Sequence, residues 1–186
     1  MSISQIKMKI LQILWVSGKP MRVQDLAEKT GLNISSSMMH LLWLRRAGHV
    51  STPEKSCYAI TKTGKEAIGL PKLTKEKALH ILRELSKEGA FHFYTGIDQR
   101  VGIYANSLND FCDKIQTVNV KSIEFHAPRR DFELWLDSLG DLELAKIMGL
   151  IRRACLSGEN LRKRIYESVK SRCEELTDLS RSPLIS

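Results

Sequence analysis

The chain has 186 residues, of which 42% are hydrophobic and 27% charged, and its formal net charge is +8. This length suits about two small domains with modest cores, and the composition excludes collagen-like and disordered chains. No apolar run reaches the roughly 18 to 20 residues that a membrane span requires, and the first residues lack the basic region and cleavage site of a secretory signal. We therefore expect a cytoplasmic protein without a membrane partner.

The four cysteines lie far apart in the sequence, at Cys57, Cys112, Cys155 and Cys173. No CxxC pair offers a zinc site, and no dense cysteine framework indicates secretion. A buried thiol acts mainly as a small apolar filler, and we interpret these four in that way. We expect neither a metal nor a cofactor.

Residues 3–15 carry apolar side chains at helical spacing and predict an amphipathic helix. A short second helix is predicted to open at Met21 and Arg22, directly after Pro20. It ends at Gly31, because glycine accepts the left-handed backbone conformation that stops a helix.

A third helix is predicted between Asn33 and Gly48. Asn33 or Ser35 can cap its first turn, because either side-chain oxygen can accept a backbone N–H. Leu41 and Leu44 recur at helical spacing and point to a core. The helix also carries the apolar residues Met38, Met39, Leu42 and Trp43. Such a helix is expected to be buried on more than one side.

Three explanations for these extra apolar residues remain open. Leu42 and Trp43 can pack on the first helix or on the second domain. They can instead form a surface for a partner or a dimer. Trp43 and Met39 can also meet unstacked bases, because aromatic faces bind single strands without base-edge hydrogen bonds.

Residues 49–52 and 57–60 predict two antiparallel strands joined by a polar loop over residues 53–56. The order of helix, turn, helix and hairpin over residues 1–70 resembles the winged helix-turn-helix superfamily of transcription regulators. Residues 58–64, Tyr-Ala-Ile-Thr-Lys-Thr-Gly, are similar to the strand-to-helix ending of its MarR-like and PadR-like branches. The resemblance implies a domain that places its third helix in the major groove of DNA.

Residues 1–70 hold ten Lys and Arg against four Asp and Glu, whereas the remainder holds 19 against 17. A basic domain attracts the phosphate backbone through counterion release. We predict phosphate contacts from Arg22, Lys55 and Lys62, with Lys7 and Lys9 as weaker candidates. The alternative for each lysine is an ordinary solvated surface.

The early outward positions of such a third helix reach base edges. The predicted base-contacting residues are Asn33, Ser35, Ser36 and His40. Arg45 and Arg46 bring charge to the end of the same helix and complete the predicted DNA-binding set. Asn33 and Ser36 can equally be caps that never meet DNA.

The boundary between the two halves is predicted at residues 69–73, where Gly and Pro interrupt the chain. Thr74 then caps a helix that we expect to reach Gly89. Residues 91–94 alternate in character and predict a strand. Phe91 and Phe93 would face inward, and His92 and Tyr94 would face outward or to an edge.

Later segments alternate between predicted strands and helices. We expect a strand over residues 101–105 that pairs back, a helix capped near Ser107, a second strand over residues 122–126, and helices from Asp131 onward. Asp141 and Ser157 are plausible caps between these helices. Residues 177–186 are predicted to form a frayed, flexible tail.

Residues 73–176 together resemble an archaeal domain family of unknown function. The resemblance rests on the motifs Phe-His-Phe-Tyr-Thr-Gly at 91–96, Tyr-Ala-Asn-Ser-Leu at 104–108, Ser-Ile-Glu-Phe-His at 122–126 with Arg129, Asp-Phe-Glu-Leu-Trp at 131–135, Leu-Gly-Asp at 139–141 with Glu-Leu-Ala at 143–145, and Gly-Glu-Asn-Leu-Arg at 158–162. It implies an archaeal source but no activity.

Polar residues near predicted strand ends raise the question of catalysis in this second half. They are His92, Glu124, His126, Arg129, Arg130 and Asp131. Outward His92 and His126 would converge on a metal or substrate if their strands were neighbours. Ordinary polar strand edges, and an Arg129–Glu124 ion pair, are the better-supported interpretation, so we expect no enzyme.

The sequence thus predicts an α+β protein: an N-terminal winged helix-turn-helix (1–70), a small α+β domain with a helical C-terminal part (73–176) and the tail. We expect a transcription regulator that binds duplex DNA and uses its second domain for assembly or sensing. A homodimer carried by the heptad-like last helices is expected. The alternative is a winged-helix module that binds single-stranded DNA, RNA or a protein in a replication, repair or translation assembly; a small enzyme is a third.

Overall fold

The structure is a computed structural model that describes residues 3–182, and it combines helices with two small antiparallel sheets. The chain divides into two compact units, Met1–Lys72 and Leu73–Ser186. Each unit has its own cluster of buried hydrophobic residues, so each is described by itself.

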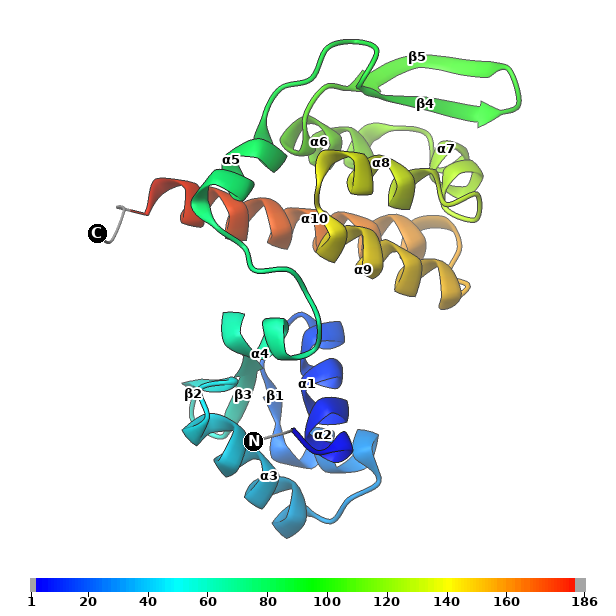
Figure 1. The fold of residues 1–186 in the computed structure, drawn as a ribbon. Helices are drawn as coiled ribbons and strands as arrows, with labels where there is room; N and C mark the ends of the chain where they lie inside the picture. The colour runs from blue at the N-terminus through cyan, green and yellow to red at the C-terminus, as the bar shows by residue number, and fades with distance from the viewer. Residues whose placement is uncertain (1–2, 183–186) are drawn as a thin grey trace. The chain divides into compact units, whose positions relative to one another are not determined.

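The first unit contains four helices and three strands in its described part (Figure 1). In chain order they are α1 (Gln5–Ser17), β1 (Met21–Arg22), α2 (Val23–Thr30), α3 (Ile34–Arg46), β2 (Val50–Glu54), β3 (Cys57–Ile60) and α4 (Lys62–Ala67). The strands form one antiparallel sheet in the order β1-β3-β2. Met21 and Arg22 were predicted to open a helix; they instead pair with Tyr58 and Cys57, and α2 begins only at Val23.

The core of the first unit lies between the three longer helices and this sheet. Leu11 of α1, Leu26 of α2, and Leu41 and Leu44 of α3 are fully buried there. The predicted helical spacing of Leu41 and Leu44 is therefore confirmed. Gly31 ends α2 with a φ of +76°, and its N–H donates to the carbonyl of Ala27 at 2.9 Å.

The second unit contains a two-stranded sheet and six helices among the described residues. They are α5 (Lys75–Leu82), β4 (Phe91–Gly96), β5 (Gln99–Ala105), α6 (Leu108–Thr117), α7 (Val120–His126), α8 (Asp131–Leu139), α9 (Leu142–Arg153) and α10 (Gly158–Arg181). In Figure 1 the long helix α10 runs beneath α5, α6 and α7 with α9 beside it, in agreement with its contacts to all four.

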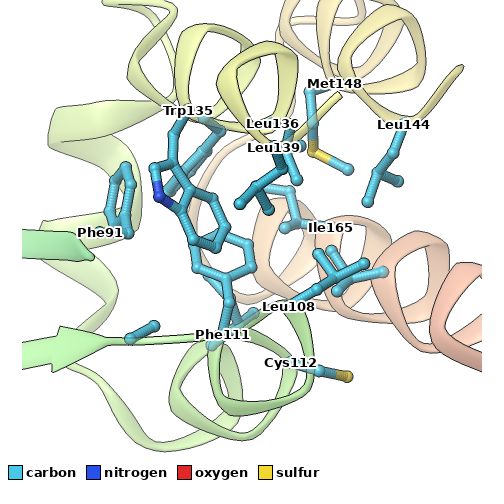
Figure 2. Packing of buried hydrophobic residues seen from close by; sticks show 14 of the residues in the cluster. Phe91, Leu108, Phe111, Cys112, Trp135, Leu136, Leu139, Leu144, Met148 and Ile165 are labelled. Atoms are coloured by element: carbon cyan, nitrogen blue, oxygen red, sulfur yellow. The ribbon is translucent and has the colours of Figure 1, made fainter. Parts of the chain in front are cut away.

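An aromatic cluster fills the core under the sheet of the second unit. Figure 2 shows Trp135 close to Phe91 and Phe111, with ring centroids 5.5 and 5.0 Å from theirs. The indole N–H of Trp135 donates to the carbonyl of Gly89 at 3.0 Å. Phe91 and Phe93 face this core, as predicted from the alternation along β4.

Three predicted elements of the second unit are wrong. Residues 122–126 belong to the helix α7 and not to a strand. Helix α5 ends at Leu82 and not at Gly89, because Arg83 is already extended and the N–H of Leu85 donates to the carbonyl of Asn106. Helix α10 continues to Arg181, so residues 177–181 are helical rather than frayed; residues 183–186 lie outside the described part.

The apolar residues of α9 and α10 point into the core of their own unit. Each of the following is less than 5% exposed: Leu144, Met148, Ile151, Leu161, Ile165, Val169 and Leu176. The heptad-like residues that we expected to carry a homodimer are therefore already packed within one chain. Cys112 and Cys173 are buried, as expected for fillers, whereas Cys155 is exposed and follows the end of α9.

Among residues 3–182, no helix combines the length and the apolar character that crossing a membrane requires.

Candidate nucleic-acid interface

The leading end of α3 is exposed and held by its own cap. The side-chain oxygen of Asn33 accepts the N–H of Ser36 at 2.8 Å, so Asn33 is the cap and Ser35 is left free of that role. Asn33 and Ser35 are exposed, and Ser36 and His40 are half-buried. Ser37 turns inward and is 1% exposed, with a hydroxyl that has no hydrogen-bond partner among the described residues.

The outward face of α3 changes character along its length. It begins with Ser35, continues with Met39 and Leu42, which are 70% and 37% exposed, and ends with Arg45 and Arg46. Residues spaced by three or four positions share a helix face, so these side chains form one continuous stripe. The stripe is polar at its start, apolar in its middle and cationic at its end.

Trp43 packs within the first unit, which is one of the outcomes anticipated for it. Its ring lies beneath the ammonium of Lys7 on α1, 3.7 Å from the ring centroid, and it borders the core. One face of the indole is therefore already occupied by a cation. Of the apolar residues on α3 that we considered for unstacked bases, Met39 alone is well exposed.

The hairpin of β2 and β3 brings two predicted phosphate contacts together. Arg22 of β1 and Glu54 of β2 both pair with Cys57 of β3, on its two sides. Lys55 occupies the two-residue turn between Glu54 and Cys57, together with Ser56, whose φ is +64°. Arg22 and Lys55 are exposed and lie at the same end of the sheet. We call these two residues the hairpin cations.

Lys62, Arg45 and Arg46 belong to the opposite end of that sheet. Lys62 opens α4 directly after β3, and Thr61 before it caps α4 and donates its hydroxyl to the carbonyl of Gly48 at 2.6 Å. Gly48 follows the end of α3, so this bond ties Lys62 to the end of α3 that carries the two arginines. All three cations are exposed.

The predicted site residues thus form three groups rather than one. Asn33 caps α3, and Ser35, Ser36 and His40 occupy its first half. The hairpin cations lie at one end of the sheet, and Arg45 and Arg46 at the end of α3, with Lys62 at the start of α4, lie at the other end. The weaker candidates have other contacts, because Lys7 covers Trp43 and Lys9 donates to the carbonyl of Thr30 at 3.2 Å.

Sequence reasoning missed β1, and with it the placement of Arg22 beside the hairpin. Two residues are too few to show the alternation that marks a strand. The pairing of Arg22 with Cys57 is a long-range contact that only the folded chain supplies.

Three of the six polar residues singled out in the second unit, His126, Arg129 and Asp131, meet at the carboxylate of Asp131. His126 is 4% exposed; its Nε2 accepts the N–H of Tyr94 at 2.9 Å, and its Nδ1 donates to Asp131 at 2.7 Å. Burial lowers the pKa of His126, against the hydrogen bond and charge of Asp131, which raise it. The ring therefore satisfies the free edge of β4 and offers no nitrogen to a metal or substrate.

The remaining polar candidates, His92, Glu124 and Arg130, bind other groups, and Arg130 pairs with Glu133 at 3.1 Å. The ring of His92 is bound through Nε2 to the carbonyl of Lys87, and Glu124 accepts the N–H of Gly158 at 2.8 Å. Arg129 pairs with Asp131 and not, as predicted, with Glu124. In the part of the chain that the structure describes, no three His, Cys, Asp or Glu side chains gather where they could hold a metal ion.

No family model, curated protein or solved structure matches this chain.

Proposed function

We propose that the first unit is a winged helix-turn-helix that binds duplex DNA, and that the protein regulates transcription. The observation that carries this proposal is the exposed, capped start of α3, with Ser35 free, in a small unit that presents Lys55 on its hairpin and Arg22 on the neighbouring strand β1. Helices of this kind enter the major groove with their first residues at base edges, while cations beside them bind phosphates. The second unit would serve assembly or sensing.

The charge of the chain supports the same assignment. Residues 1–70 have an excess of six positive charges, from ten Lys and Arg against four Asp and Glu, while the remainder has an excess of two, from 19 against 17. Phosphate contacts made by such cations give affinity without sequence preference. Preference between sequences would then come from Ser35 and His40 on α3.

The test is binding of the whole protein to labelled duplex DNA, single-stranded DNA and structured RNA, measured in competition. Duplex should compete best. Arg22→Ala and Lys55→Ala should weaken binding to every duplex alike, whereas Ser35→Ala and His40→Ala should change the ranking of duplex sequences. Stronger competition by single strands, at the α3 surface, would contradict duplex recognition.

Asn33 needs a different substitution, because it caps α3. Asn33→Ala would remove the cap and cost about 1 kcal/mol of stability, which would confuse folding with binding. Asn33→Ser keeps a capping oxygen and removes the amide that could contact a base. A change in sequence preference for Asn33→Ser, with unchanged unfolding, would identify Asn33 as a base-contacting residue.

The exposed apolar part of α3 favours a second candidate function, the docking of a protein partner within a replication, repair or translation assembly. Met39 is 70% exposed and Leu42 is 37% exposed, at the middle of the face that duplex DNA would meet. Met39→Lys separates the two functions. It should strengthen duplex binding if α3 lies in a groove, and abolish partner capture if α3 docks on a protein.

A homodimer that binds two half-sites remains part of the proposal. Because α9 and α10 bury their apolar residues, dimerisation would need another surface or the DNA itself. The molar mass of the free protein and of the complex, measured by light scattering, distinguishes one copy per duplex from two.

A further inference from the structure

The two-stranded sheet of the second unit has a second face that the core does not use. Phe91 and Phe93 of β4 point into the core and are 6% and 1% exposed. Successive residues of a strand point to opposite faces, so His92 and Tyr94 belong to the other face. On β5 the same face carries Tyr104, which is 40% exposed.

The pairing of the strands groups the polar and aromatic residues on this face. His92 lies opposite Tyr104, and their ring centroids are 5.6 Å apart. Tyr94 lies opposite Arg100, whose guanidinium carbon is 6.0 Å from the centroid of the Tyr94 ring. Two adjacent positions along the sheet therefore each combine a tyrosine with a cationic or imidazole side chain.

A bulge in β5 opens a hollow on this face. From Tyr104 to Arg100 the chain of β5 takes four steps where β4 takes two, from His92 to Tyr94. Gly102 lies within the extra residues, with a φ of +76° that side chains rarely tolerate. The hollow has a volume of about 180 Å³, and the residues that line it include Lys87, His92, Arg100, Gly102, Ile103 and Tyr104.

The lining of the hollow combines these cationic and aromatic side chains with Ile103, Gly102 and the edge of the core residue Phe93, and it includes no acidic residue. The ammonium of Lys87 is 6.0 Å from the Tyr104 ring centroid. The backbone carbonyl of Lys87 accepts a hydrogen bond from the ring of His92 at 2.9 Å. Glu88 and Asp98 are nearby in the sequence and exposed, but neither lines the hollow. An anionic ligand would thus meet two positive charges beside a tyrosine ring.

We propose that this surface, formed by Lys87, His92, Tyr94, Arg100 and Tyr104 and called here the ribbon face, binds single-stranded nucleic acid. A base stacks on Tyr104 in the hollow while the flanking phosphates contact Lys87 and Arg100. Aromatic rings beside cations bind single strands, because unstacked bases expose their flat faces and every nucleotide carries a charge. Duplex bases are already stacked on one another, so the ribbon face does not select duplex.

The proposal is independent of the duplex-binding function, because the ribbon face belongs to the second unit and α3 to the first. The two sites would give one protein a contact to duplex and another to a displaced or transcribed strand. Each can be removed by substitution without touching the other.

The test uses the full-length protein and a labelled oligothymidylate of about 10 nucleotides, with binding followed by fluorescence anisotropy. Tyr104→Ala should weaken binding about tenfold, since stacking on one aromatic ring typically contributes a factor of about 5 to 150. Tyr104→Phe keeps the ring and should bind like the natural protein. Arg100→Ala should weaken binding and reduce the slope of log K against log salt by about 0.7.

Matched controls come from exposed side chains elsewhere in the second unit. Leu134, which is 60% exposed, and Lys146 allow Leu134→Ala and Lys146→Ala, which remove comparable surface and charge away from the ribbon face. Both should leave single-strand binding unchanged. Because Arg100 is exposed, Arg100→Ala keeps the test valid even where Tyr104→Ala fails to fold.

Three results would overturn the proposal. One is unchanged single-strand affinity in both Tyr104→Ala and Arg100→Ala. Another is loss of single-strand binding in an Arg22→Ala, Lys55→Ala double variant while Tyr104→Ala binds normally, which would place the strand on the first unit. The last is competition by free thymidine monophosphate as strong as by the oligonucleotide, which would identify a mononucleotide pocket instead.

Discussion

Some single residues of this protein stabilise it through buried hydrogen bonds, and His126 is the clearest case. Its ring is enclosed by aromatic neighbours, including Phe91 at 4.9 Å and Phe132 at 5.7 Å between ring centroids. Its two nitrogens bind the N–H of Tyr94 and the carboxylate of Asp131. A second proton on the ring would abolish the acceptor that Tyr94 uses, and burial disfavours the charge that this proton brings.

The stability of the second unit should therefore fall in mild acid. The pKa of His126 is lowered in the folded state, mainly by burial, so the unfolded chain binds the proton more readily. The stabilisation is complete above the unfolded pKa of about 6.5 and is lost progressively as the pH falls below it. Urea unfolding followed at pH 7 and pH 5 should show the decrease in the free energy of unfolding.

His126→Gln provides the comparison for this pH effect. Its amide oxygen can still accept the N–H of Tyr94, but it does not titrate. The variant should be less stable at pH 7 by about 1–2 kcal/mol, because the bond to Asp131 is lost, and it should lose less stability on going to pH 5. An equal decrease in the natural protein and the variant would assign the acid effect to another group.

Arg172 is a second residue whose loss should be severe. It is 6% exposed on α10 and contacts Asp141 through two nitrogens at 2.8 and 2.9 Å, with Glu143 at 2.8 Å and Glu175 at 2.7 Å. These carboxylates hold the pKa of the Arg172 guanidinium above its ordinary value against the opposing effect of burial.

Arg172→Met should destabilise the second unit by about 3–5 kcal/mol, because it leaves the fully buried Asp141 without its counter-charge. Lys163→Met is a suitable control, since Lys163 also lies on α10 but is exposed and pairs with the exposed Glu167 at 4.0 Å. Thermal unfolding of both variants checks the difference. Similar unfolding temperatures would show that the buried pair contributes no more than an ordinary surface ion pair.

At the level of elements, the sequence predicted the features that depend only on residues close together in the chain. The stop at Gly31, the inward phenylalanines of β4 and a cap of α3 at Asn33 or Ser35 each follow from a few neighbouring residues, and the structure selects Asn33 as the cap. The alternation along β4 also placed His92 and Tyr94 outward, and these are two of the five residues of the ribbon face. The sequence singled out Arg22 and Lys55 individually as phosphate contacts, but it did not predict that they lie at the same end of the sheet.

The elements that were missed depend on contacts distant in the sequence. Residues 122–126 are too short for periodicity to separate strand from helix, and α7 is fixed by packing against β4 and α10. The strand β1 exists only through its partner β3, and the bulge around Gly102 depends on the register with β4. For the same reason the sequence did not predict the ribbon face as a site.

The packing of α4 gives a test of how tightly the elements of the first unit are joined. Gly64 of α4 is buried, and a Cβ added to it would overlap the carbonyl oxygen of His49, with Ile60 Cγ1 at 2.7 Å. Backbone cannot move aside as a flexible side chain can. Gly64→Ala should therefore destabilise the first unit by about 1–3 kcal/mol.

Gly89→Ala is the matched control for this substitution. The added Cβ there would meet its nearest neighbour, Leu85 Cβ, at 3.7 Å, which is ordinary contact. Urea unfolding should show little change for Gly89→Ala. If Gly64→Ala unfolded like the natural protein, α4 would have to be free to shift away from His49.

For the molecule as a whole, the unequal distribution of charge connects the fold to the proposed function. The first 70 residues hold an excess of six positive charges on a small unit, and the hairpin cations account for two of them. Each phosphate contact that a cation makes on duplex DNA contributes about 0.9 to the slope of log K against log salt. The slope therefore counts the contacts directly, without knowledge of the target sequence.

Arg22→Ala combined with Lys55→Ala should reduce the magnitude of that slope by roughly 1.8, on any duplex sequence, because two phosphate contacts are lost. Lys146→Ala combined with Arg153→Ala removes the same charge from exposed positions on α9 and should leave the slope unchanged. Anisotropy titrations of the full-length protein across a salt series check both. Equal reductions in the two double variants would mean that net charge alone, and not contact by the hairpin, attracts the duplex.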